Sequence, residues 1–180
     1  MKKINFIILL AVIACSGLQA QVFNTSSTLK LGQFSLGVEP ALYINGGNDF
    51  NLFLHGGAGI TSNVDFGLKL GIGGGDVYFG GDVEFSLNRF FSISGGAHVY
   101  NDLGLDATGL VTLPLGSSAR LYSGLDTDIV FADGGPYMPL WVPLGLEIPI
   151  KKYLLFYFET EIRLTNYGYH IIGGGVSFIF

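Results

Sequence analysis

The sequence has little charge, almost no cysteine and no long apolar run. Charged residues make up only 13% of the 180 positions and hydrophobic residues 49%, which excludes a disordered acidic polymer. The longest unbroken apolar run, residues 6–15, has ten residues, about half of what a helix needs to span ~30 Å of hydrocarbon. A hydrophobic chain without spanning helices can cross a membrane only as a closed β-barrel, and this is our working hypothesis.

The single cysteine lies in a segment that looks like an export signal. Lys2 and Lys3 precede the apolar run, and small residues follow up to Ala20, which predicts a secretory signal peptide over residues 1–20 that is removed after Ala20. Cleavage there removes Cys15, so no disulfide, thiol nucleophile or thiolate metal site remains. The alternative is lipidation at Cys15, because residues 12–15 also form a loose lipobox.

The mature chain is acidic. Removal of Lys2 and Lys3 leaves 7 of the 9 basic residues against 14 Asp and Glu, so binding of nucleic acid through its phosphates is not expected. His55 and His170 have no carboxylate at metal-ligand spacing. We therefore expect no metal and no cofactor.

From residue 31 onward, apolar side chains recur at every second position in segments of about ten residues. Such a segment, tilted by about 45°, matches the height of the apolar band of a membrane barrel. The sequence thus predicts an all-β fold: a closed antiparallel up-and-down transmembrane β-barrel over residues 31–180, with short turns at both ends and a periplasmic segment over residues 21–30. Ten strands are expected, with eight as the alternative. The ten segments are 31–43, 50–60, 64–73, 77–87, 90–100, 105–115, 119–131, 138–150, 153–164 and 169–180.

Each segment has one apolar face and one face rich in charge and glycine. We expect the apolar face to contact lipid and the other face to line the lumen, where glycine leaves room for long side chains. Ten acidic and three basic side chains fall on the inner face. We expect them to form a polar network, with hydrogen-bonded acid pairs, buried water or bound cations around Asp82, Glu84, Glu147, Glu159 and Glu161. The other interpretation is a polar core locked by Lys69, Arg120 and Arg163, without transport. The charged side chains of the inner face are Glu39, Asp65, Lys69, Asp82, Glu84, Asp106, Arg120, Asp126, Asp128, Glu147, Glu159, Glu161 and Arg163.

An even number of strands places both termini at one end of the barrel, which in outer-membrane proteins is the periplasmic end with tight turns. Aromatic residues gather toward the opposite, loop end, where we expect an interfacial girdle. These residues are Tyr43, Phe50, Tyr78, Tyr100, Tyr137, Trp141, Tyr167 and Tyr169.

Two short motifs resemble those of a known class. The chain ends on Phe180 with the apolar residues Phe178 and Val176 at alternate positions before it, which is similar to the assembly signal of Gram-negative outer-membrane β-barrels. Residues 18–21, Leu-Gln-Ala-Gln, are similar to the signal-peptide junctions of Bacteroidota secretory proteins. The resemblance implies export to the outer membrane, help from periplasmic chaperones, insertion by the barrel-assembly machinery, and contact with lipid and lipopolysaccharide. No subfamily is indicated, and the surface partner is unknown.

The sequence favours a structural or surface-interaction role for such a barrel. One alternative is a narrow cation-preferring pore, because rings of carboxylates select cations. Another is a secreted soluble barrel that binds a ligand, with the apolar face turned inward. Catalysis is not expected: His98 lies near Ser94, Asp102 and Asp106 at one end of a strand, as in rim acyltransferases, deacylases or proteases, but no nucleophile motif accompanies it.

Overall fold

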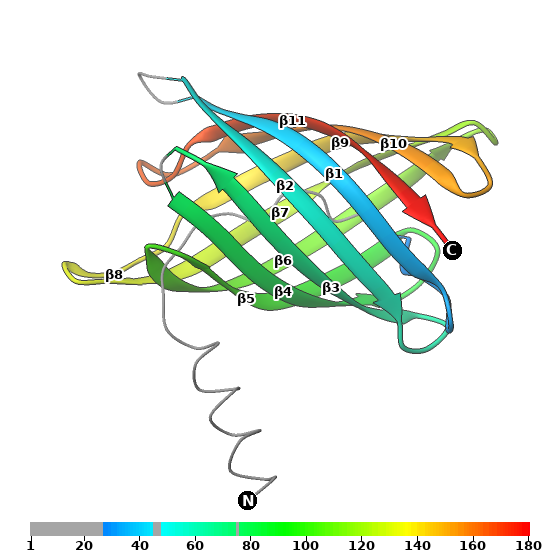
Figure 1. Cartoon of the computed structure of the whole chain (residues 1–180), viewed down its shortest axis with the longest axis horizontal. Helices are drawn as coiled ribbons and strands as arrows, with labels where there is room; N and C mark the ends of the chain where they lie inside the picture. Colours follow the sequence, from blue (N-terminus) through cyan, green and yellow to red (C-terminus); the bar gives the residue numbers. More distant parts are fainter. Residues whose placement is uncertain (1–26, 45–47, 75) are drawn as a thin grey trace, which may run out of the picture.

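The structure, a computed structural model, describes residues 27–44, 48–74 and 76–180, which fold almost entirely into antiparallel strands (Figure 1). Within these ranges no helix is long and apolar enough to cross a membrane. The strands are β1 (Phe34–Ile44), β2 (Asn48–Gly59), β3 (Val64–Gly73), β4 (Asp76–Ser86), β5 (Phe91–Tyr100), β6 (Asp102–Leu115), β7 (Ala119–Ala132), β8 (Gly135–Tyr137), β9 (Leu140–Lys151), β10 (Leu154–Arg163) and β11 (His170–Ile179).

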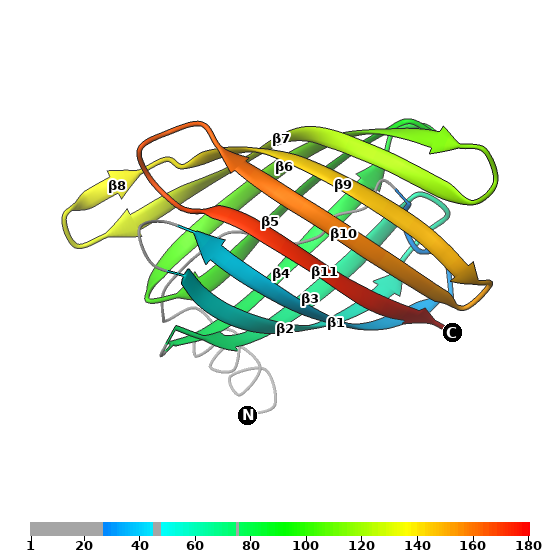
Figure 2. The same cartoon turned by 90° about the horizontal axis from the view of Figure 1, so that it is seen from above.

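Ten of these strands close into a ring. Each pairs antiparallel with its neighbour in the order β6-β5-β4-β3-β2-β1-β11-β10-β9-β7, and β6 pairs with β7. The seam pairs the first strand with the last, from Ser35 opposite Ile179 to Ile44 opposite His170, as Figure 2 shows from above. The predicted ten-stranded up-and-down barrel is therefore confirmed, and the eight-stranded alternative is wrong.

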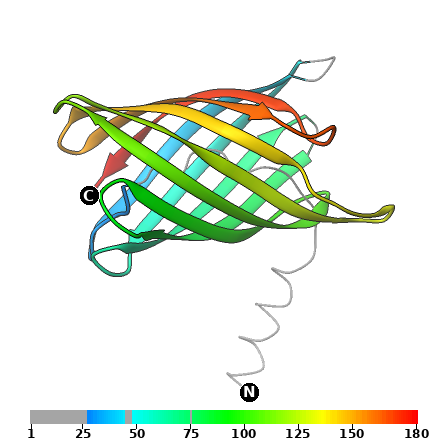
Figure 3. The same ribbon diagram turned by 180° about the vertical axis from the view of Figure 1, so that it is seen from behind.

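The short strand β8 was not predicted. It pairs only with the end of β7, Ala132 opposite Gly135, and the resulting hairpin projects beyond the ring at the loop end (Figure 3). Gly135 has a φ of 103°, which glycine adopts without strain. Three residues are too few to show an alternating pattern, so periodicity carries no signal for this strand.

The faces of the sheet are distributed as the alternation predicts. On β3, Phe66, Leu68 and Ile72 point outward with 37–58% of their surface exposed, whereas Asp65 and Lys69 are buried inside. The same division recurs around the ring. A soluble barrel would bury its apolar face, so the structure contradicts the alternative of a soluble ligand-binding barrel.

Inward glycines make room for aromatic rings on the neighbouring strand. Gly145 lies directly opposite Tyr122 in the β7–β9 pair, and a Cβ at position 145 would overlap the Tyr122 ring. Gly71 lies between Phe53 and Tyr78 of the two flanking strands. Glycine at these two positions therefore leaves the space that large aromatic rings need in a narrow lumen.

Only part of the predicted aromatic girdle is present in the structure. Tyr43, Tyr78 and Trp141 point into the lumen and are 1–3% exposed, where they pack with Phe53 and Ile171 in one apolar cluster. Tyr100 and Tyr169 pack against this cluster, whereas Phe50 and Tyr167 remain more than half exposed. The prediction considered only the position of these residues near strand ends, although the alternation places Tyr78 on the same inner face as Asp82 and Glu84. The cluster therefore lies inside the barrel and not at its lipid-facing surface.

Candidate functional site

The charged side chains assigned to the inner face lie in the lumen. All ten acidic residues are 0–9% exposed and Lys69 is 6% exposed, while Arg120 and Arg163 are half-buried. Burying charges in a narrow lumen costs free energy unless they are paired or hydrogen-bonded. The partners of each group therefore determine whether the lumen is stable.

The basic residues have different partners. Arg120 on β7 forms an ion pair with Glu147, which lies directly across the β7–β9 pair. Arg163 instead donates a hydrogen bond to the carbonyl of Gly168 at 2.8 Å, near the loop end. The sequence does not show which carboxylate Arg120 meets, because the register that brings Arg120 and Glu147 together is not visible in it.

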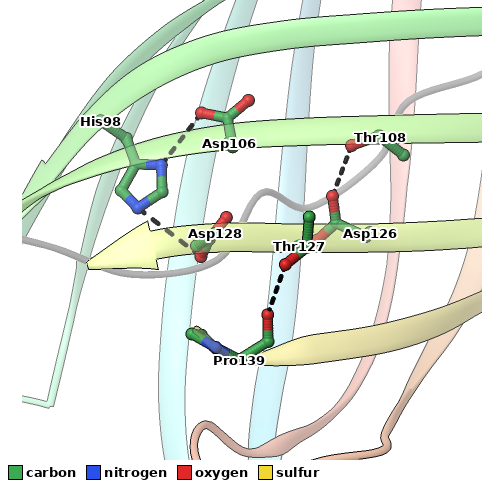
Figure 4. A network of polar contacts seen from close by, with 7 residues as sticks. All are labelled: His98, Asp106, Thr108, Asp126, Thr127, Asp128 and Pro139. Atoms are coloured by element: carbon green, nitrogen blue, oxygen red, sulfur yellow. Dashed lines mark hydrogen bonds and ion pairs between the residues drawn. The ribbon is translucent and has the colours of Figure 1, made fainter. Parts of the chain in front are cut away.

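A histidine bridges two carboxylates on the β6–β7 wall (Figure 4). His98 on β5 is 1% exposed. Its Nδ1 lies 3.1 Å from Asp106 and its Nε2 lies 3.8 Å from Asp128. The two aspartates are direct partners across the strand pair, and the imidazole lies beside both carboxyl groups. The Tyr78 ring stacks on His98 at 5.5 Å between centroids, and Thr108 donates a hydrogen bond to Asp126 beside the aspartate pair.

A cavity of about 130 Å³ lies near the turn end of the lumen. Among its lining residues are Glu39, Asp65, Asp82 and Glu84, together with the basic Lys69. His55 also lines it, and its Nε2 contacts the carboxyl group of Glu39. Among the described residues, the Lys69 Nζ has no hydrogen-bond partner. Acidic groups thus dominate the wall, with one ammonium group among them.

Residues 27–30 belong to the segment that the sequence assigns to the periplasm. The structure places Ser27 and Leu29 on the wall of this cavity, at the turn end of the barrel. The Leu29 N–H donates a 2.6 Å hydrogen bond to Asp65, and Arg120 donates one to Ser27. These residues carry no alternating pattern of their own. The available signal was the pair of inward glycines Gly57 and Gly59, which leaves space for a further chain segment.

The residues of the proposed assembly signal lie on β11 and directly after it. Phe178 and Phe180 of the proposed assembly signal are 43% and 72% exposed, and Val176 pairs with Val38 across the seam. Over the described ranges, no group of three or more His, Cys, Asp or Glu side chains is arranged to hold a metal ion. The predicted signal peptide, residues 1–20, lies outside the described residues.

An apolar exterior, a closed antiparallel ring and a polar lumen define an up-and-down β-barrel of the transmembrane type. No known protein family and no curated protein matches the chain. Its structure is similar to the translocator domain of autotransporter NalP from Neisseria meningitidis, with 12% identity over 82% of this chain and 88% of that one and a TM-score of 0.51. It is also similar to the KdgM porin, with 11% identity over 80% of this chain and 99% of that one and a TM-score of 0.51. The chain thus has the fold of outer-membrane β-barrels.

Proposed function

We propose that this protein is an integral outer-membrane β-barrel with a structural or surface-interaction role, and that its lumen is filled by the polar network and does not conduct. The exposed apolar exterior supports a place in the membrane. The β7–β8 hairpin supports a surface role, because it projects beyond the ring, and Met138 directly after β8 is 56% exposed. Lipid and lipopolysaccharide would surround the barrel, and chaperones and the barrel-assembly machinery would act during its biogenesis.

Burial of the lumen side chains is the observation that carries this proposal. Tyr122, Asp128, Trp141 and Glu147 come from β7 and β9, and Glu39 comes from the far side of the ring, yet each is only 0–1% exposed. A water-filled pore would leave such groups accessible to solvent. The His98 ring nitrogens both face carboxylates, which also supports a structural role for this residue rather than catalysis at the rim.

Cell fractionation tests the location. We expect the protein in the outer membrane, with a band on SDS gels that migrates differently before and after boiling, because a barrel with every strand paired resists SDS until it is heated. Recovery of a soluble, heat-insensitive protein from the periplasm or the medium would contradict the proposal.

Planar-bilayer recording tests whether the lumen is closed. We expect no conductance steps after insertion of the purified barrel, since the buried aromatic cluster and the polar network occupy the lumen. A porin of known conductance serves as the control for insertion. Cation-selective steps would instead favour the pore alternative, which the excess of acidic over basic lumen residues supports.

A further inference from the structure

We infer that residues 27–30 form a strap that crosses the lumen near the turn end and restricts access to the cavity lined by Lys69. Such a strap goes beyond the proposed role and does not depend on whether the barrel conducts. Its own contacts, the glycines beneath it and the position of its anchors in the ring all point to this arrangement.

The strap is held at both ends by polar contacts. At one end, the Leu29 N–H donates to Asp65 on β3 at 2.6 Å, a bond to a carboxylate that is stronger than one to a neutral acceptor. At the other end, Ser27 accepts a hydrogen bond from Arg120 on β7. A tight turn then links the strap to β1, where the Gln33 N–H donates to the Lys30 carbonyl at 2.9 Å.

The anchors lie on opposite walls. The strap packs against β2, and Arg120 belongs to β7. Four strands separate β2 from β7 in either direction around the ring. The strap and the Arg120 side chain that reaches it from β7 therefore bridge the lumen together. Ser27 and Leu29 line the cavity together with Asp82 and Glu84, so the strap forms one of the cavity walls.

Two glycines on β2 form the seat of the strap. A Cβ at Gly57 would lie 2.8 Å from Leu29 Cδ1, and a Cβ at Gly59 would overlap the carbonyl group of Lys30. The first overlap involves the end of a flexible side chain, but the second involves backbone, which cannot rotate away. Gly56 lies on the same strand but has open space where its Cβ would be. The recess is thus specific to the inner face beneath the strap.

Cysteine labelling can test the strap in the full-length protein extracted from the outer membrane. Ser177 lines the cavity, so Ser177→Cys reports its accessibility to a small water-soluble methanethiosulfonate, with the labelled peptide identified by mass. In this background, Gly59→Leu should displace the strap and raise the labelling rate by about fivefold or more, as expected when a protected site opens locally. Gly56→Leu is the matched control and should leave the rate unchanged.

Two further variants separate displacement of the strap from general loosening of the barrel. If Gly59→Leu does not give a heat-modifiable band, Asp65→Ala replaces it, because this change removes the acceptor of the Leu29 N–H and should also raise the rate. Thr108→Cys, at a 7% exposed position outside the cavity, should stay slow to label in every variant. Equal labelling of the Ser177→Cys protein with and without the strap-displacing change would overturn the inference, as would a matching increase in the Thr108→Cys protein.

Discussion

Replacing Gly145 by leucine should destabilise the barrel by about 3 kcal/mol, the upper part of the range for overpacked interiors. The new Cβ would overlap the Tyr122 ring. That ring is 1% exposed, so it cannot move aside without disturbing other lumen side chains. The midpoint of urea unfolding measures the effect, with fluorescence of the single tryptophan, the buried Trp141, as the probe.

Gly109→Leu provides the matched control on β6. Its Cβ would meet nothing within 4 Å, so this variant should unfold near the wild-type midpoint. If the two variants were equally stable, the packing of Tyr122 over Gly145 would not be a constraint on the fold. If both were equally unstable, the cost would reflect glycine in the sheet generally rather than this contact.

Replacing Arg120 by methionine should destabilise the barrel by about 2–3 kcal/mol, because breaking a buried ion pair leaves its partner uncompensated. Glu147 is 1% exposed, so water cannot solvate its carboxylate once the guanidinium is gone. We expect a smaller effect than for a fully buried pair, because the Arg120 side chain is 32% exposed. The same urea titration measures it.

A double variant separates loss of the pair from loss of side-chain packing. Arg120→Met combined with Glu147→Gln should recover much of the lost stability, since no unpaired buried charge remains. Lys151→Met, at an exposed position at the end of β9, should change little. No recovery in the double variant would mean that Arg120 acts through packing or through Ser27 rather than through Glu147.

Alternation predicted most of the fold because a membrane barrel imposes it on every strand. Segments 64–73 and 119–131 differ from β3 and β7 by no more than one residue, and the inner and outer faces follow directly from the period of two. The sequence could not show β8, which is too short for a period. The burial of Tyr78 and Trp141 was visible in the alternation, because Tyr78 lies on the same face as Asp82 and Trp141 on the same face as Glu147. The girdle prediction used only the position of each aromatic residue along its strand, and by that position alone an aromatic residue in the lumen cannot be told from one at the membrane interface.

The pairing of the lumen charges could not be predicted for a different reason. Inward orientation is a property of one strand, but a partner depends on the register between strands. His98 meets Asp106 and Asp128 only because Asp106 lies opposite Asp128 across β6 and β7. That register is set by the turn at residues 116–118, where Gly116 has a φ of 69°. Similarly, the inward glycines Gly57 and Gly59 indicate space in the lumen, but the sequence does not show which segment of the chain fills it.

The seam between β1 and β11 has a consequence for the order of assembly. Most strand pairs join neighbours in the chain and can form as hairpins while the polypeptide is still emerging. The pair from Ser35 and Ile179 to Ile44 and His170 joins the two extremes of the barrel sequence, so it has the largest loop-closure entropy and forms slowly. Until β11 arrives, β1 and β10 remain open edges capable of pairing with other chains. The last ten residues therefore decide when the protein passes from an aggregation-prone sheet to a closed cylinder.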